Sequence, residues 1–254
     1  MRILGVMLKK DLLEQSRSKH IIILIFLFLF VAITSPIISK LMPMIMQSIL
    51  PNQLKITISE PTFIDAVDQF IKNISQLAII ILVFMVAGTV TGEKSSKTLE
   101  LLFVKPVPRE IFIISKFLSR YITIGLTYFI NSLFFYLYTI SIFKTFSFVN
   151  FLIVDLLMMF YIFLIVTFTI FASTFSRKTI IAAISGFVIF IFFNYILSLF
   201  KKISDFLPNY ILGNYRSIIT YGFTKNLWGS LIVILGLIIL FILFSILIFK
   251  KQEL

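Results

Sequence analysis

The sequence predicts an all-α polytopic membrane protein with six transmembrane helices and both termini in the cytoplasm. Hydrophobic residues make up 59% of the 254 residues and charged residues only 13%, which is about half the charged share of a soluble domain. The mean hydropathy is +1.08. Six segments are long and apolar enough to cross a hydrocarbon core about 30 Å thick. The 31 Phe residues and the long Ile and Leu runs exceed what one soluble core could bury.

The six predicted spans follow one another within a single domain that covers residues 1–254. Alternation with a period of two is absent, so the spans are expected to be helices and not barrel strands. The second span is the least apolar of the six, and Asp155 interrupts the fourth. The predicted spans are 21–38, 70–90, 121–143, 148–172, 179–200 and 227–249.

Lys and Arg residues in the connections predict the orientation. The N-terminal segment, the connections at 91–120 and 173–178 and the C-terminal tail carry 15 of them, whereas the other three connections carry 8. We therefore expect both termini and the connection at 91–120 to lie in the cytoplasm. Residues 201–226, which are rich in aromatic side chains, are expected to form short helices that dip into the outer leaflet.

Residues 1–20 predict a helix that lies on the inner membrane surface. Their apolar side chains fall on one side of a helix, with Lys9 and Arg17 on the other; the apolar ones are Ile3, Leu4, Met7, Leu8 and Leu12. A frayed basic tail is the alternative interpretation.

The composition excludes several kinds of chemistry. With no Cys, one His and 11 acidic residues, the chain lacks the material for a disulfide scaffold, a zinc site or a His-based triad. The net charge of +12 suits lipid headgroups better than nucleic acid in so apolar a chain. Residues 88–95 look like a phosphate-binding loop, but the spacing fails and Glu93 would oppose a phosphate. We expect no catalytic, metal-binding or cofactor-binding residue and no nucleic-acid partner.

The connection at 92–120 carries the most informative pattern. Leu99, Leu102 and Phe103 share an i, i+3, i+4 stripe, and Glu93 and Lys97 are spaced for an ion pair on the exposed side. Pro106 ends this short helix, and a second helix then runs into the third span. An apolar stripe without a core of its own favours a groove on a partner protein; contact with the membrane or with the N-terminal helix is the alternative.

Four short runs in this connection resemble the signature of ABC-2 type permeases, the membrane subunits of ATP-binding-cassette transporters. The runs are Gly92-Glu93-Lys94, Thr98-Leu99-Glu100-Leu101-Leu102, Pro106-Val107-Pro108-Arg109 and Lys116-Phe117. The run Lys9-Lys10-Asp11-Leu12 is also similar to the entrance helix of that family. Three positions depart from the pattern, namely Lys97 in place of Gly, Pro108 in place of Ser or Thr, and Ser115 in place of Gly.

The resemblance implies a permease in the cell membrane that pairs with a second, identical or homologous permease. Two separate ABC ATPase subunits would bind ATP, so the chain itself would need no cofactor and would not be an enzyme. Residues 93–104 would form a coupling helix that meets the ATPase, and the family mostly exports its substrates. The implied coupling residues are Glu93, Thr98, Leu99, Glu100, Leu102, Phe103, Pro106 and Arg109.

The sequence gives less information about the substrate and its pathway than about the fold. The sparsely charged interior favours a hydrophobic or amphipathic substrate such as a peptide, drug or lipid. Asp155, Asn131 and Asn194 are the prominent polar side chains within spans and are candidates for the pathway. A channel or secondary transporter is the alternative function, although it predicts several ionisable residues inside the membrane. A membrane-embedded enzyme would need a nucleophile and base, which the chain does not supply at membrane depth.

Overall fold

The computed structural model describes residues 2–49, 60–104, 106–143, 147–196, 199, 206–222 and 226–252. All the regular structure in this part of the chain is helical, and six helical segments are long and apolar enough to cross a membrane. The prediction of an all-α protein with six spans is confirmed. The spans are His20–Ser48, Phe63–Ser95, Arg109–Phe143, Phe148–Phe175, Thr179–Ile196 and Leu227–Lys250.

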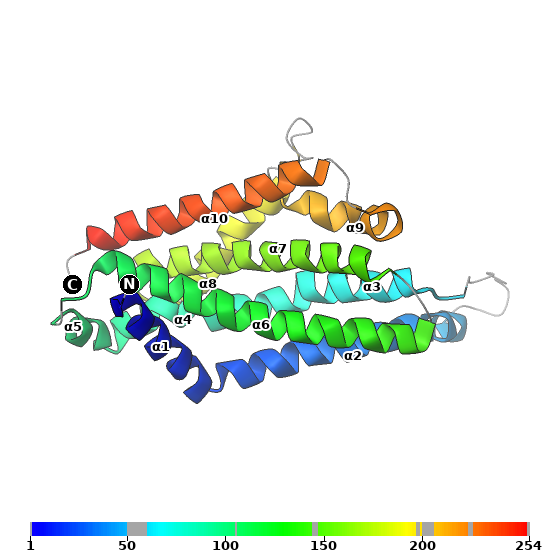
Figure 1. Cartoon of the computed structure of the whole chain (residues 1–254), viewed down its shortest axis with the longest axis horizontal. Coiled ribbons are helices and arrows are strands. Elements are labelled where there is room, and N and C mark those ends of the chain that lie inside the picture. Colours follow the sequence, from blue (N-terminus) through cyan, green and yellow to red (C-terminus); the bar gives the residue numbers. More distant parts are fainter. Residues whose placement is uncertain are drawn as a thin grey trace.

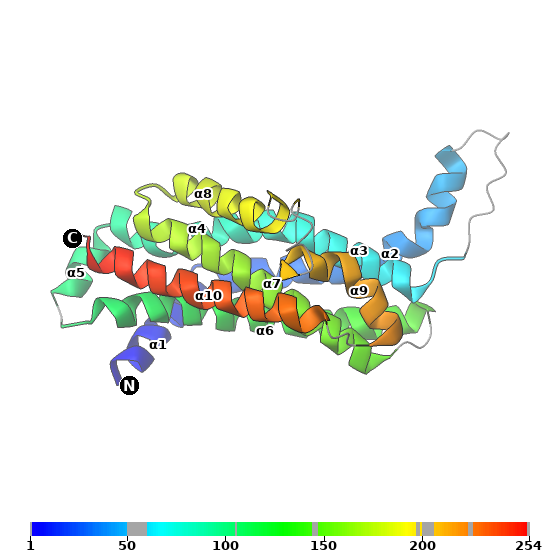
Figure 2. The same ribbon diagram turned by 90° about the horizontal axis from the view of Figure 1, so that it is seen from above.

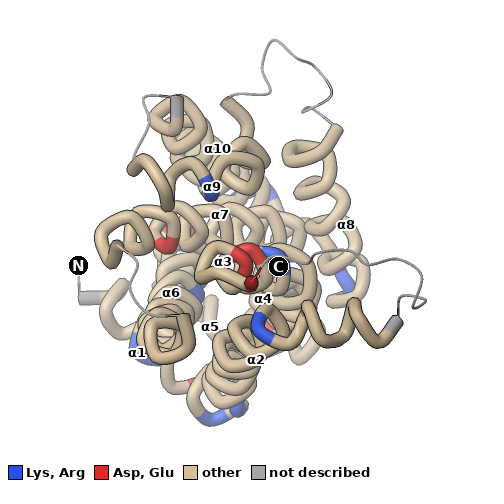
Figure 3. The backbone as a smooth tube through the Cα atoms, turned by 90° about the vertical axis from the view of Figure 1, so that its right-hand side faces the viewer, with Lys and Arg blue, Asp and Glu red and all other residues tan. Residues whose placement is uncertain are grey.

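The elements form one elongated bundle with distinct ends (Figure 1). Helix α1 (Arg2–Arg17), the short helix α5 (Thr98–Phe103) and the end of α10 (Asn226–Lys250) lie at one end. The start of α3 (Phe63–Asn73) and helix α9 (Asn209–Tyr221) lie at the other. The two ends of the chain are therefore on the same side of the bundle, as an even number of spans requires. Seen along its length, the bundle carries few charged residues (Figure 3).

The first two spans are longer than the sequence predicted. Helix α2 (His20–Ile49) continues through Pro36 and Pro43, and its last part turns away from the bundle (Figure 2); proline is a common cause of such a bend. The second span combines α3, a π-helical turn at Ile74–Ala78 and α4 (Ile79–Ser95). Its start is fixed by Asp65, whose carboxylate accepts a hydrogen bond of 2.8 Å from the backbone N–H of Thr62, a capping box.

Helix α7 (Phe148–Phe175) is the centre of the bundle. It packs against α4, α6 (Arg109–Phe143), α8 (Thr179–Ile191), α9 and α10, and it buries a larger share of its length than any other span described. The Ser173 hydroxyl donates to the backbone carbonyl of Ala87 at 2.7 Å and accepts from the backbone N–H of Thr91 at 3.0 Å. These bonds attach α7 to α4 inside the bundle, where water is not available to satisfy them.

The connection at 201–226 contains α9, so the expected short helix is present in its described part. Residues 200–205 and 223–225 lie outside the described residues. Helix α9 packs on α7 and α10. Its residue Arg216 forms an ion pair with Asp68 of α3, which joins the end of the second span to this connection. The pKa of Arg216 is raised by this hydrogen bond and by the charge of Asp68.

Candidate functional site

Helix α5 occupies the position of the predicted coupling segment. Helix α4 ends at Ser95, the chain turns at Ser96 and Lys97, and six residues of α5 lead to the proline turn before α6. Lys97 has a φ of 56°, in the left-handed region where glycine is favoured. The Thr98 hydroxyl donates to the backbone carbonyl of Glu93 at 3.3 Å. The exposed Pro106 follows α5, so the helix ends where the sequence predicted.

The face of α5 that was predicted to meet a partner packs on the chain itself. Leu99 is only 1% exposed, and the Phe103 ring contacts the rings of Phe112 and Phe249 at centroid distances of 5.7 and 6.0 Å. Leu102 is partly buried against the same core. The prediction that Leu99, Leu102 and Phe103 point into a partner's groove is therefore wrong for Leu99, because Leu99 is buried within the chain itself.

A different pair of apolar side chains is free on α5. Leu101 is 73% exposed and Val104, directly after the last residue of α5, is 83% exposed; Glu100, which precedes Leu101 in the chain, is also exposed. These three side chains, which we call the α5 outer face, lie at the extreme end of the bundle, where Figure 1 shows α5. Large apolar side chains so exposed at an end that carries charged helices are suited to contact with another protein.

A buried charge cluster at the same end of the bundle as α5 joins α1, α4 and α6. The ammonium group of Lys116 on α6 donates to Asp11 of α1 at 2.7 Å and to Glu93 of α4 at 2.6 Å. The hydroxyl of Ser115 donates to the second oxygen of Asp11 at 3.0 Å. Lys10 donates to Glu93 at 2.6 Å. The expected surface pair of Glu93 with Lys97 is therefore wrong, since Glu93 turns inward to two lysines.

This charge cluster opposes the separation of α1, α4 and α6. Lys116 is 3% exposed and Asp11 2% exposed, so neither charge is compensated by water, and each depends on the other. Lys10 is half exposed. Burial lowers the pKa of Lys10, but the hydrogen bond and charge of Glu93 outweigh that effect, and the pKa is raised above its ordinary value. The three helices are therefore expected to move as one unit at this end.

Arg109 has a role inside the chain. Its guanidinium group donates to the backbone carbonyls of Lys250 at 2.8 Å and Gln252 at 2.7 Å, which satisfies carbonyls that the end of α10 leaves open. A cation at this position also complements the helix dipole. Lys250 in turn forms an ion pair with Glu110. The start of α6 is thus fastened to the end of α10.

The three candidate pathway residues lie inside the chain and are not brought together. Asp155 is 2% exposed and accepts a hydrogen bond of 2.8 Å from Ser132 of α6. Asn131 donates to the backbone carbonyl of Thr127 at 2.7 Å, within its own helix. Asn194 donates to the hydroxyl of Tyr161 at 2.6 Å. Asp155 and Asn194 thus bridge neighbouring helices, and none of the three lines the cavities described next. Their expected part in a pathway stays a prediction.

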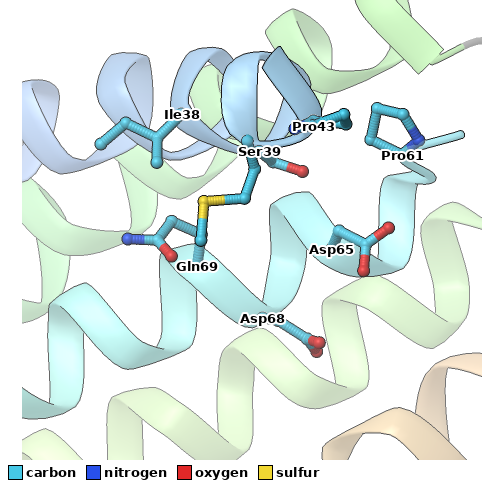
Figure 4. A pocket seen from close by; sticks show the side chains of 8 residues that line it. Ile38, Ser39, Pro43, Pro61, Asp65, Asp68 and Gln69 are labelled. Atoms are coloured by element: carbon cyan, nitrogen blue, oxygen red, sulfur yellow. The ribbon is translucent and has the colours of Figure 1, made fainter. Parts of the chain in front are cut away.

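Two cavities of similar size lie at opposite ends of the bundle. One, of about 260 Å³, lies between α2 and α3; Figure 4 shows Ser39 and Pro43 facing Asp65 and Gln69 across it. The other, also about 260 Å³, lies beside the buried charge cluster and is lined by residues of α1, α4 and α6. The second cavity is on the same side as α5.

Sequence reasoning did not assign a role to Asp11, Lys116 or Arg120. Asp11 and Lys116 were named only within the runs that resemble the family signature, and Arg120 was not named at all. A usable signal was present, because acidic residues are scarce and Asp11 and Glu93 both fall at the charged end of a span. The pairing itself needs the packing of α1 on α6, which no spacing along the chain reveals.

Comparison with known proteins identifies the family of this chain. The family described as ABC-2 family transporter protein matches residues 6–254. The chain is 25% identical to the protein described as uncharacterized transmembrane protein YxlG of Bacillus subtilis strain 168, over 100% of this chain and 99% of that protein. The match begins within α1 and runs to the end of the chain, so it includes the charge cluster and α5. This multi-pass membrane protein belongs to the ABC-2 family of transporter proteins.

Proposed function

We propose that this chain is the permease subunit of an ATP-driven exporter whose ATP is hydrolysed by two copies of a separate ABC ATPase subunit. The observation that carries the proposal is the α5 outer face, because Leu101 and Val104 are left exposed at the end of a bundle from an ABC-2 family. The proposal places α5 and both termini in the cytoplasm, in agreement with the excess of Lys and Arg at that end. A second permease, identical or homologous, completes the pathway.

The buried charge cluster supports a lever mechanism for this proposal. Helix α5 is connected directly to α4 and, through the proline turn, to α6. Because Glu93 on α4 and Lys116 on α6 share an ion pair that also holds Asp11 of α1, displacement of α5 by the ATPase moves three helices together. Such a unit can switch between two arrangements of a packed bundle.

The proposed substrate is hydrophobic or amphipathic, such as a peptide, drug or lipid. The support is the composition of the bundle, in which apolar and aromatic side chains dominate and charged residues amount to 13%. A channel or secondary transporter is the alternative. It would function without an ATPase, whereas the proposed permease depends on one.

Charge substitution on the α5 outer face tests the proposal. Burial of one large apolar side chain contributes about 1.5–3 kcal/mol, so Leu101→Glu or Val104→Glu should weaken the complex with the ABC ATPase subunit by roughly a hundredfold, which corresponds to about 2.8 kcal/mol. Val6→Glu is the matched control, because Val6 is 65% exposed at the same end but lies on α1. Co-purification and substrate efflux are measured. Wild-type ATPase binding and efflux in both α5 variants would refute the coupling role.

A further inference from the structure

The cavity beside the charge cluster contains a buried cation that forms no ion pair with any described residue. Arg120 of α6 lines this cavity and is 8% exposed. Its Nε has no hydrogen-bond partner within the described part of the chain, and no carboxylate there comes within 4.0 Å of the guanidinium group. Buried Arg side chains are normally paired. The arrangement is therefore suited to an anionic group inside the cavity.

The neighbouring carboxylates are not equivalent. Asp11 is already engaged, since it accepts hydrogen bonds from Lys116 and Ser115. Glu14, which also lines the cavity, is exposed and forms no ion pair among the described residues. Its charge and that of Asp11 act on Arg120. Within the described part of the chain, the cavity thus presents a guanidinium group and a carboxylate that form no ion pair, a combination that disfavours a simple anion and matches a group that carries both charges.

Part of the cavity lining is apolar and reaches the surface of the bundle. Phe84 of α4 lines it and is 57% exposed, and Met85 beside it is partly buried. Phe84 lies eleven residues before the end of α4 at Ser95, which corresponds to about 16 Å along a helix at 1.5 Å per residue. His20, the first residue of α2, lines the same cavity. The cavity therefore joins polar residues at the end of the bundle to an exposed apolar side chain of a membrane-spanning helix.

We propose that this cavity binds the headgroup of an amine-bearing phospholipid, with the phosphate on Arg120, the ammonium group facing Glu14 and the first part of the acyl chains against Phe84 and Met85. The cavity volume of about 260 Å³ is slightly below the usual range for small-molecule sites, ~300–1,000 Å³. It accommodates a headgroup but not a whole lipid, so the chains extend into the bilayer.

Two other occupants fit the same residues less well. The carboxylates of Asp11, Glu14 and Glu93 lie close enough to hold a metal ion, but Asp11 and Glu93 already share the ammonium group of Lys116. Free phosphate would meet two carboxylates and only one uncommitted cation. Neither occupant uses the apolar wall. The proposal does not depend on an ATPase, because the site is complete within this chain.

Lipid titration of the purified full-length chain tests the proposal. The protein is stripped of lipid in detergent and titrated with phosphatidylethanolamine, with phosphatidylglycerol of the same acyl chains, and with the water-soluble glycerophosphoethanolamine. Native mass spectrometry and the thermal midpoint report binding. We expect phosphatidylethanolamine to bind at least tenfold more tightly than either of the other two. Equal binding of the two lipids, or tighter binding of the soluble headgroup, would overturn the proposal.

Three variants locate the site. Arg120→Gln should weaken phosphatidylethanolamine binding at least tenfold, and Glu14→Gln should remove the preference over phosphatidylglycerol. Gly88→Leu fills the cavity without changing a charge; a Cβ at Gly88 meets only Thr179 Cγ2 at 3.7 Å, so this variant checks the result if Arg120→Gln fails to fold. The exposed Arg17→Gln on α1 is the control. Wild-type lipid affinity in Gly88→Leu would contradict the proposed location.

Discussion

Lys97 sets the direction in which the chain leaves α4. Its φ of 56° and ψ of 11° are left-handed, a conformation that costs a residue with a Cβ about 1–2 kcal/mol. The resemblance to ABC-2 permeases places a glycine at this position. The backbone at Lys97 therefore adopts the conformation that a glycine would adopt there, and the Cβ of lysine makes this conformation less favourable.

Substitution at Lys97 should separate this cost from any effect of charge. Lys97→Gly is expected to raise the stability of the chain by roughly 0.5–1 kcal/mol. Glycine adopts the left-handed conformation without strain, and its larger loss of conformational entropy on folding offsets only part of that gain. Lys97→Val should lower the stability, because a β-branched side chain is poorly accommodated at positive φ. Thermal unfolding in detergent measures both. A lower midpoint for Lys97→Gly than for the wild type would contradict the interpretation.

Lys116 neutralises two carboxylates that have little contact with water. Lys116→Met should destabilise the chain by about 3–5 kcal/mol, because it leaves Asp11 and Glu93 as poorly compensated buried charges. The addition of Asp11→Asn and Glu93→Gln to the same chain should recover most of the loss. The exposed Lys9→Met is the control. The assignment fails if Lys116→Met unfolds at the same temperature as Lys9→Met.

Helices α7 and α8 approach each other closely at Gly186. A Cβ on Gly186 would lie 2.8 Å from the backbone Cα of Thr169, a distance that requires the two helices to separate. Small residues commonly allow such approach in membrane helices. The contact holds α8, most of whose length is not buried within the chain, against the central helix.

Gly186→Ala should therefore be destabilising by about 1–3 kcal/mol, as expected for overpacking. Gly236→Ala on α10 is the matched control, because no heavy atom lies within 4 Å of its added Cβ and alanine favours a helix by up to ~1 kcal/mol. Midpoints of thermal unfolding in lipid nanodiscs compare the two. Equal midpoints for the two variants would show that the close approach does not contribute to stability.

At the scale of the whole molecule, composition and hydropathy were sufficient to predict the six spans. They did not predict the end of α2 or the start of α3, because the helical residues at 39–49 and 63–69 lie outside the predicted apolar spans at 21–38 and 70–90. The position of α5 was predicted from Pro106 and the charge pattern, but its buried side was not. A six-residue helix can pack either side inward, and the aromatic partners of Phe103, namely Phe112 and Phe249, lie on α6 and α10, with Phe249 far away in the sequence. The pairing of Asp11 with Lys116 was not predicted either, because the two residues are far apart in the sequence.

The outer surface of the bundle leaves room for a second permease. Large apolar side chains are exposed along α2, α6, α8 and α10, and such a surface can face lipid or another subunit. The expected result of a mass measurement in nanodiscs is a permease dimer in the complex with the ATPase. Transport by a complex that contains a single permease would contradict this expectation.

The central claim, that the α5 outer face contacts the ATPase, can be tested by site-specific cross-linking. The chain contains no Cys, so Val104→Cys and the control Val6→Cys each introduce a single thiol into an otherwise unmodified protein. After labelling with a photoactivatable reagent in membranes that contain the ATPase, Val104→Cys should cross-link to the ATPase, and the yield should change when ATP is added. Val6→Cys should give no such product. Absence of a cross-link from Val104→Cys, or equal yields from the two positions, would contradict the account.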